Sequence, residues 1–243
     1  MRFLQPVVGT KPLFLCLAGN LCSPAVFDKI QVPTFMQKVY VDYLAEPGPW
    51  EIHSIGANLV SRVRNFGGLP VIVAAYSAGG VVAMSAVSQA PELFAGLVLS
   101  STGPCSLGHG DPNFPQELKD NIDNEVYMRK FLSSCFYHPI SKEMENVLWE
   151  YTRTLNKEAG YDVSRSLRQE DYRILLKRFK NPVAIIHGKF DNRRKLDAVE
   201  LLKESLPQAA VTLLNTGHTP MWEDSEGYQK ALDSLLKKAL PVY

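Results

Sequence analysis

Short, unbroken runs of apolar residues recur along this 243-residue chain, and helix-like patterns separate them. Runs of this length that are rich in β-branched residues suit strands of a parallel sheet covered on both faces. The alternation predicts an α/β fold with a doubly wound, mainly parallel sheet and right-handed crossovers. The expected strands are Pro12–Leu17, Val39–Leu44, Pro70–Tyr76, Phe94–Leu99, Pro182–Ile186 and Val211–Leu214, and the expected helices are Trp50–Phe66, Gly79–Ser88, Leu196–Leu206 and Asp224–Ala239.

The alternation stops between the fourth and fifth of these strands. Residues 105–178 contain no clear strand, and helical patterns cover Ser141–Leu155 and about Ser164–Phe179. An all-helical insertion at this point is often a lid over the carboxyl ends of the strands, where open α/β sheets bind ligands. We therefore expect a core of residues 1–104 and 179–243 with a helical cap at 105–178, a structural excursion being the alternative.

Composition and charge exclude several classes of protein. Hydrophobic residues make up 46% of the chain, and 26 basic against 25 acidic residues give a net charge of +1. That balance is too apolar for a disordered chain and too neutral for a protein whose main partner is nucleic acid. No apolar run reaches the roughly 18 residues of a membrane span. We expect a small-molecule substrate, neither nucleic acid nor membrane as partner, and a monomer or homodimer.

The four cysteines predict no metal or redox centre. Cys16, Cys22, Cys105 and Cys135 lack the spacing of a zinc site or a CxxC pair, and no Gly-rich phosphate loop is present. We expect free thiols in the cytoplasm, with no metal and no organic cofactor. The N-terminal apolar run faintly resembles a signal peptide, but it is short, follows Pro12 and has no A-x-A site near it.

A serine stands where the third expected strand gives way to a helix. The sequence Ala75-Tyr76-Ser77-Ala78-Gly79-Gly80 follows the pattern small-x-Ser-x-Gly. So sharp a turn holds the serine in a strained backbone conformation, so its neighbours two positions away must be small. The positive end of the following helix favours a developing oxyanion. Ser77 is therefore the candidate nucleophile, and a serine that only caps the helix is the alternative.

A nucleophilic serine needs a base, and His218 is the histidine best placed to act as one. It lies between the last expected strand and the last helix, at the same sheet edge as Ser77. Asp191, just past the fifth strand, would orient the imidazole, and the chain order Ser…Asp…His suits this layout. The weaker candidates are His53, His109, His138 and His187 for the base and Asp111, Asp197 and Glu223 for the acid.

The loop after the first expected strand would complete the site. The segment Leu17-Ala18-Gly19-Asn20-Leu21 leaves that strand at the same edge as the serine. A backbone N–H of Asn20 or Leu21, together with that of Ala78, could converge on a carbonyl oxygen as an oxyanion hole.

Together these motifs resemble the α/β-hydrolase fold superfamily, in its serine-nucleophile branch with a helical cap. The resemblance spans nearly the whole chain, and it implies a serine hydrolase but no particular substrate. Three features depart from the usual pattern. Ala18 stands where a histidine usually precedes the oxyanion-loop glycine, residues 43–48 replace the usual Asp-x-x-Gly-x-Gly, and the two leading antiparallel strands are absent or vestigial.

The resemblance implies hydrolysis of a small carboxylic ester or thioester through an acyl-serine intermediate. A lyase, C–C hydrolase or cyclase with the same triad, or a ligand receptor on the same fold, is the alternative. Tyr76 resembles the elbow of the menaquinone-pathway lyases, although Val81 stands where those enzymes carry an arginine.

The cap is aromatic, which favours an apolar pocket for an acyl chain or ring system. We expect the substrate-binding residues to be Tyr76, Trp149, Met221 and Trp222, while packing within the cap core would equally explain its aromatics. The cap arginines could hold an acidic substrate, or they could form a solvated helix face.

Overall fold

The computed structural model describes residues 1–45, 47–106 and 111–241 of the chain. Its core is a seven-stranded sheet in the order β1-β3-β2-β4-β5-β6-β7, and every pairing is parallel except that of β1 with β3. The predicted doubly wound, mainly parallel sheet is confirmed. The strands are β1 Arg2–Phe3, β2 Leu13–Leu17, β3 Gln37–Asp42, β4 Val71–Tyr76, β5 Gly96–Ser100, β6 Val183–Gly188 and β7 Ala210–Leu214.

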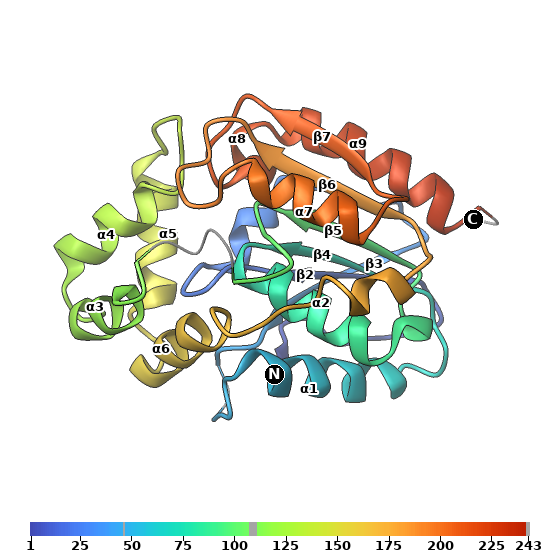
Figure 1. Cartoon of the computed structure of the whole chain (residues 1–243), viewed down its shortest axis with the longest axis horizontal. Coiled ribbons are helices and arrows are strands. Elements are labelled where there is room, and N and C mark those ends of the chain that lie inside the picture. Colours follow the sequence, from blue (N-terminus) through green and yellow to red (C-terminus); the bar gives the residue numbers. More distant parts are fainter. Residues whose placement is uncertain (46, 107–110, 242–243) are drawn as a thin grey trace.

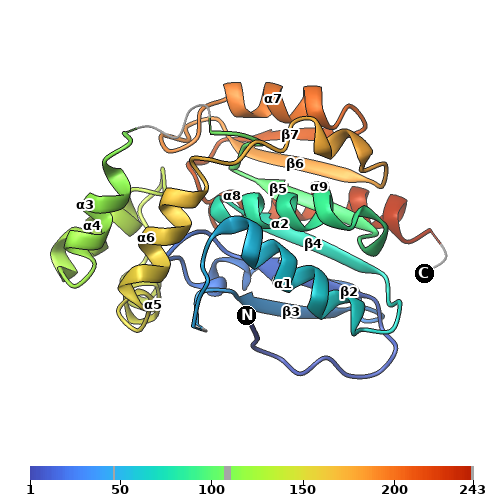
Figure 2. The same ribbon diagram turned by 60° about the horizontal axis from the view of Figure 1, so that its bottom comes forward.

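The central strands are unbroken apolar runs because both of their faces are covered. In β2, Leu13, Leu15 and Leu17 pack into one core cluster, whereas Phe14 and Cys16 pack into another on the opposite face. The first cluster includes α1 Ile52–Arg64, α2 Ala78–Gln89 and α7 Asp197–Ser205, and the second includes α9 Ser225–Ala239 and the short helix η1 Pro24–Phe27. Figure 2 shows α1 and α2 side by side over the first face.

Four helices stand together beyond the carboxyl ends of the strands (Figures 1 and 2). They are α3 Phe114–Asn121, α4 Glu125–Ser133, α5 Lys142–Thr152 and α6 Lys157–Ser166. The chain enters this group after β5 and returns through the short helix η3 Leu175–Arg178 to β6. The carboxyl ends of β4, β6 and β7 therefore face these helices rather than open solvent.

The helix expected over Ser164–Phe179 is wrong, because α6 ends at Ser166 and turns separate it from η3. Asp171 supplies a local reason. Its carboxylate accepts the backbone N–H of Arg173 at 3.1 Å and also pairs with the Arg173 guanidinium. Such side-chain bonds to the nearby backbone compete with helix formation.

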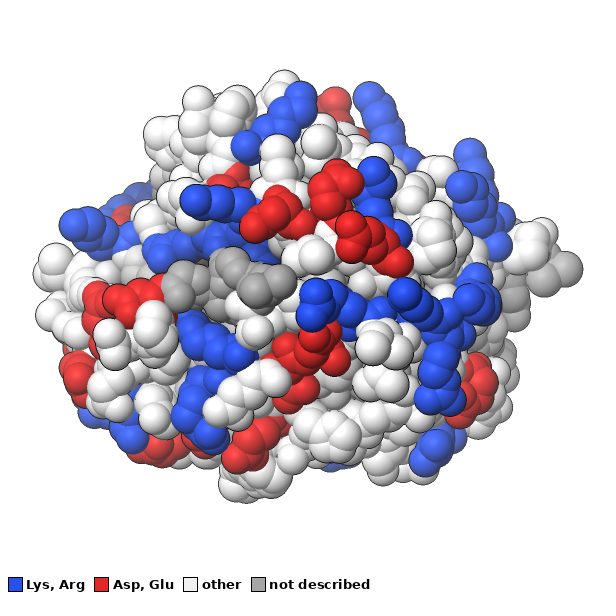
Figure 3. All heavy atoms as spheres, in the orientation of Figure 1, with Lys and Arg blue, Asp and Glu red and all other residues white. Residues whose placement is uncertain are grey.

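The remaining short helices are η2 Pro91–Leu93 and α8 Pro220–Glu223, the latter directly before α9. Within the described ranges, no helix has the length and apolar character needed to cross a bilayer. Acidic and basic side chains are interspersed over the face shown in Figure 3, in keeping with the near-zero net charge.

Candidate active site

Ser77 occupies a strained turn between β4 and α2. Its backbone angles are φ 53° and ψ −121°, a region that non-glycine residues rarely adopt. Three hydrogen bonds hold the turn: the Ser77 N–H donates to the Ser100 carbonyl at 2.9 Å, and the Ser77 carbonyl accepts from Thr102 Oγ1 at 2.8 Å and from the Gly80 N–H at 2.9 Å. The serine is thus fixed at the end of a fully buried strand.

The small residues around the serine are required by close packing. A methyl carbon added at Gly79 would lie 2.4 Å from the carbonyl oxygen of Ala18, and one added at Gly80 would lie 2.6 Å from the Thr102 side chain. Both distances are shorter than a van der Waals contact, so larger residues would push the helix away from the neighbouring loops. The absence of β-carbons at these positions therefore keeps the turn, the loop after β2 and the segment after β5 together.

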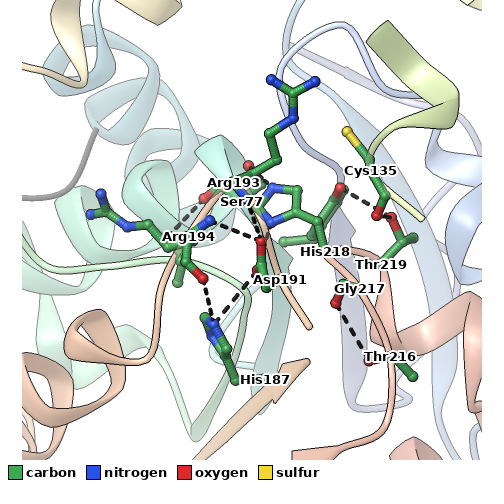
Figure 4. Close-up of polar contacts among 12 residues, drawn as sticks. Ser77, Cys135, His187, Asp191, Arg193, Arg194, Thr216, Gly217, His218 and Thr219 are labelled. Carbon is green, nitrogen blue, oxygen red and sulfur yellow. Dashed lines mark hydrogen bonds and ion pairs between the residues drawn. The ribbon is translucent and has the colours of Figure 1, made fainter. Parts of the chain in front are cut away.

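An unbroken chain of hydrogen bonds joins Ser77, His218 and Asp191 (Figure 4). His218 Nε2 lies 2.9 Å from Ser77 Oγ, and His218 Nδ1 lies 2.8 Å from Asp191 Oδ2. The other carboxylate oxygen of Asp191 accepts the backbone N–H groups of Arg193 and Arg194, each at 2.8 Å. The carboxylate is therefore held from both sides, in the order expected of a nucleophile, a base and an orienting acid.

The environment of Asp191 keeps it ionised. Burial alone would raise the pKa of Asp191. The charge and hydrogen bond of His218 and the hydrogen bond from the Arg194 backbone N–H outweigh burial and lower the pKa below its ordinary value. A second imidazole, His187, lies 3.6 Å from Asp191 Oδ2 and bonds through Nε2 to the Arg194 carbonyl at 2.8 Å. Burial lowers the pKa of His187, which favours its neutral form. Its bond to the Arg194 carbonyl supports the loop that carries Asp191.

Of the weaker candidates that the structure describes, none is hydrogen-bonded into this chain. Asp111 lines the cavity, but its carboxylate accepts the Asn113 N–H at 2.8 Å and its backbone carbonyl accepts Arg168 Nη2 at 3.4 Å. Asp197 bonds the Ala198 N–H at the start of α7, and Glu223 accepts N–H groups of Tyr137, His138 and Gly217. His53 lies on α1, His138 bonds the Asn215 carbonyl, and His109 lies outside the described residues.

The predicted oxyanion loop lies beside the serine, with one correction. Asn20 and Ala78 line the same cavity as Ser77, and neither backbone N–H has a hydrogen-bond acceptor within the described part of the chain. Leu21 is fully buried and does not line the cavity, and its carbonyl accepts Thr152 Oγ1 at 2.7 Å. The side chain of Asn20 donates to the Gly160 carbonyl at 2.8 Å, which fastens the loop to α6.

Ser77 and His218 open into a cavity of about 340 Å³ between the sheet and the helices α3–α6. Its wall is mainly apolar and includes Phe114, Leu118, Phe131, Leu132, Phe136, Leu148 and Leu167. Tyr76 lines it as expected, with its hydroxyl 3.2 Å from Thr219 Oγ1. The thiols of Cys22 and Cys135 also line it, and burial raises the pKa of Cys135 to about 11.

Three of the predicted pocket residues lie elsewhere. Trp149 packs with Leu118 and Met128 in the core between the helices α3–α6, and Met221 is fully buried against α9. Trp222 lies under the Lys29 ammonium, which is 4.0 Å from its ring centroid. In each case the aromatic or apolar side chain serves packing rather than the cavity wall. The cavity residues that sequence reasoning missed include Arg193 and Arg194, which closely follow Asp191 in the chain.

Among the described residues, no group of three or more His, Cys, Asp or Glu side chains is arranged to hold a metal ion. The four cysteines are unpaired thiols.

Comparison with known proteins agrees with this architecture. The model of a family described as the alpha/beta hydrolase family matches residues 38–230. A pimeloyl-acyl-carrier protein methyl ester esterase from Nitrosomonas europaea is 26% identical over 195 residues, covering 67% of this chain and 70% of that protein. An esterase from Exiguobacterium antarcticum superposes with a TM-score of 0.83 at 15% identity, covering 95% of this chain and 93% of that one. A hydrolase from Pseudomonas aeruginosa gives 0.80 at 18% identity, with 97% and 92% covered. At these identities the two structures are evidence for the fold.

Proposed function

Because this chain belongs to the alpha/beta hydrolase family, we propose that it hydrolyses small carboxylic esters or thioesters through an acyl-serine intermediate on Ser77. Family membership confirms the predicted fold and the prediction of a hydrolase. The observation that carries the finer proposal is the hydrogen-bonded chain from Ser77 through His218 to Asp191, which opens into a mainly apolar cavity. The substrate of the Nitrosomonas europaea relative, a methyl ester, supports the same class of reaction.

In this mechanism His218 is the general base and then the general acid. Nε2 takes the proton of Ser77 Oγ as the oxygen attacks the ester carbonyl. Asp191 accepts the hydrogen bond from His218 Nδ1–H and stabilises the imidazolium that forms. The imidazolium then protonates the departing alcohol or thiol, and a water molecule activated by His218 releases the acid.

The oxyanion of the tetrahedral intermediate needs donors fixed before the reaction. We propose the backbone N–H groups of Asn20 and Ala78, since both residues line the cavity beside Ser77 and both groups lack an acceptor among the described residues. Each such donor is typically worth about 3–4 kcal/mol of barrier. The bond from Asn20 to Gly160 would keep its loop in place during turnover.

We also propose that residues 105–178 act as a cap on a core of residues 1–104 and 179–243. The support is that α3–α6 stand over the carboxyl ends of the strands and supply most of the apolar cavity wall. A cap in this place excludes water and selects the acyl group.

A fluorophosphonate probe and a short acyl ester, p-nitrophenyl butyrate, test the proposal directly. Wild type should be labelled at Ser77 and should turn over the ester, whereas Ser77→Ala should lose the label and at least about 10⁴-fold of kcat. Ser61→Ala, an exposed serine on α1, is the matched control. Mass spectrometry of the quenched reaction should show an acyl group on Ser77, which separates ester hydrolysis from lyase chemistry. Full activity of Ser77→Ala would overturn the proposal.

A further inference from the structure

Arg193 places a positive charge in the wall of the cavity two residues after the orienting acid. Its backbone N–H is fixed on Asp191 Oδ1 at 2.8 Å, but its side chain extends away from that carboxylate (Figure 4). The guanidinium lies over the ring of Phe131, 4.7 Å from the centroid, and the residue lines the same cavity as Ser77 and His218. The charge therefore faces the space that a substrate would fill.

The guanidinium of Arg193 is only partly satisfied by the protein. Nη2 donates to Ser134 Oγ and reaches the Phe131 carbonyl at 3.5 Å. Nε is buried without an acceptor, and no carboxylate among the described residues forms an ion pair with the group. Because Nε is buried, a ligand in the cavity would bond the terminal nitrogens of the guanidinium and supply the counter-charge that the described residues lack.

The surroundings do not neutralise this charge. Among the described residues that line the cavity, Arg168 and Arg194 add positive charge and Asp111 is the one carboxylate. The rest of the wall is largely apolar, so an anion inside the cavity would meet a surplus of positive charge at low dielectric.

We propose that the ester substrate carries a second group, an oxyanion such as a carboxylate or phosphate, and that Arg193 binds it. The proposal rests on the proposed esterase function and names the substrate class of the same site. Guanidinium suits this role because its planar donors match the two oxygens of a carboxylate or phosphate. The acyl chain between the ester and the anion would lie along the apolar wall that Phe131 and its neighbours provide.

Three methyl esters of one chain length test the proposal: methyl hexanoate, which is neutral, monomethyl adipate, which ends in a carboxylate, and methyl 6-phosphonooxyhexanoate, which ends in a phosphate. For wild type, kcat/KM should be at least about tenfold higher for one of the anionic esters than for the neutral one. The anionic ester with the higher kcat/KM shows whether the second group of the substrate is a carboxylate or a phosphate. Monomethyl esters of shorter and longer diacids then locate the best distance between the two groups.

The variant Arg193→Met keeps the apolar stem on Phe131 and the backbone N–H on Asp191 while it removes the charge. The ratio of kcat/KM for the anionic ester to that for the neutral ester should fall by about 10- to 100-fold, mainly through KM, because the contact is remote from the reacting carbonyl. Arg193→Lys should restore part of the ratio. Arg64→Gln, an exposed arginine at the end of α1, should leave it unchanged.

A purely structural role for Arg193 makes different predictions. If the side chain only braces the end of α4 through Ser134, Ser134→Ala should lower activity on every ester as Arg193→Met does. The proposal expects Ser134→Ala to keep the anionic preference, since it frees a donor of Arg193. Equal losses on neutral and anionic esters, or no anionic preference in wild type, would overturn the proposal. Ser77-dependent hydrolysis of methyl hexanoate would still support the proposed function in that case.

Discussion

Replacing Asp191 by asparagine tests whether the carboxylate sets the tautomer of His218. Asparagine has the same shape, and its carbonyl oxygen can still accept the backbone N–H groups of Arg193 and Arg194 that now bond Oδ1. That orientation points the amide NH₂ at His218 Nδ1, which lies 2.8 Å from Oδ2 in wild type. Two N–H donors cannot face each other, so Nδ1 must lose its proton and Nε2 must carry one. The imidazole then presents a donor to Ser77 Oγ and cannot act as its base.

The expected loss follows from this wrong tautomer. A comparable change in a serine protease lowers kcat by about 10⁴-fold, which corresponds to about 5.5 kcal/mol at 1.36 kcal/mol per decade. His187 cannot replace His218 as the base, because its Nε2 is hydrogen-bonded to the Arg194 carbonyl at 2.8 Å. The hydrogen bonds from the backbone N–H groups of Arg193 and Arg194 to position 191 survive, so we expect KM and the folded structure to change little.

The assay is kcat for p-nitrophenyl butyrate, with the rate of fluorophosphonate labelling as a second measure of serine reactivity. Both should fall together in Asp191→Asn, while the thermal unfolding curve stays cooperative. Asp197→Asn is the matched control, since Asp197 is an exposed aspartate in the next turn of chain, where its carboxylate accepts the Ala198 N–H at the start of α7. A loss of kcat smaller than tenfold in Asp191→Asn, or an equal loss in the control, would refute the tautomer argument.

Three shorter predictions concern stability and reactivity. Gly188→Ala should destabilise the fold by about 3 kcal/mol or more, measured by urea unfolding, because its methyl carbon would lie 1.8 Å from the Gly217 carbonyl oxygen. Because the pKa of Asp191 is lowered, wild type should gain stability over Asp191→Asn above about pH 4, and should lose it as pH falls through the native pKa; thermal unfolding from pH 6 to pH 3 measures this. Because burial raises the pKa of Cys135 from 9.0 to about 11, native protein at pH 8 should alkylate there about 100-fold more slowly than unfolded protein, measured by peptide mass spectrometry with iodoacetamide.

The fold and the meeting of the three distant side chains could be predicted because both follow from strand periodicity. Ser77, Asp191 and His218 each follow a buried strand by a few residues, and parallel strands bring their carboxyl ends to one edge. The structure places these side chains within hydrogen-bond distance of one another. The exact register of the loops was not needed for that inference.

The cavity wall could not be predicted in the same way. Trp149 lies on α5 and Met221 follows His218 closely in sequence, but whether a helical side chain faces the cavity or the core between helices depends on how the helices are rotated. The pattern that suggested a helix over Ser164–Phe179 was real in its spacing, yet the side-chain bonds of Asp171 interrupt it. Periodicity specifies that a face is apolar but not which neighbour covers it.

Arg193 shows why a loop can hide its role in the sequence. A basic residue near an aspartate in a loop is typical of a solvated charge. Here the backbone N–H groups of Arg193 and Arg194 hold Asp191, while both residues line the cavity. One segment thus fixes the acid through its amides and contacts the substrate space through its side chains. Side-chain substitutions at these positions can change substrate choice while the hydrogen bonds from the backbone N–H groups to Asp191 persist. An inserted residue between 191 and 193 would displace those amides, and we expect it to weaken catalysis and selectivity together.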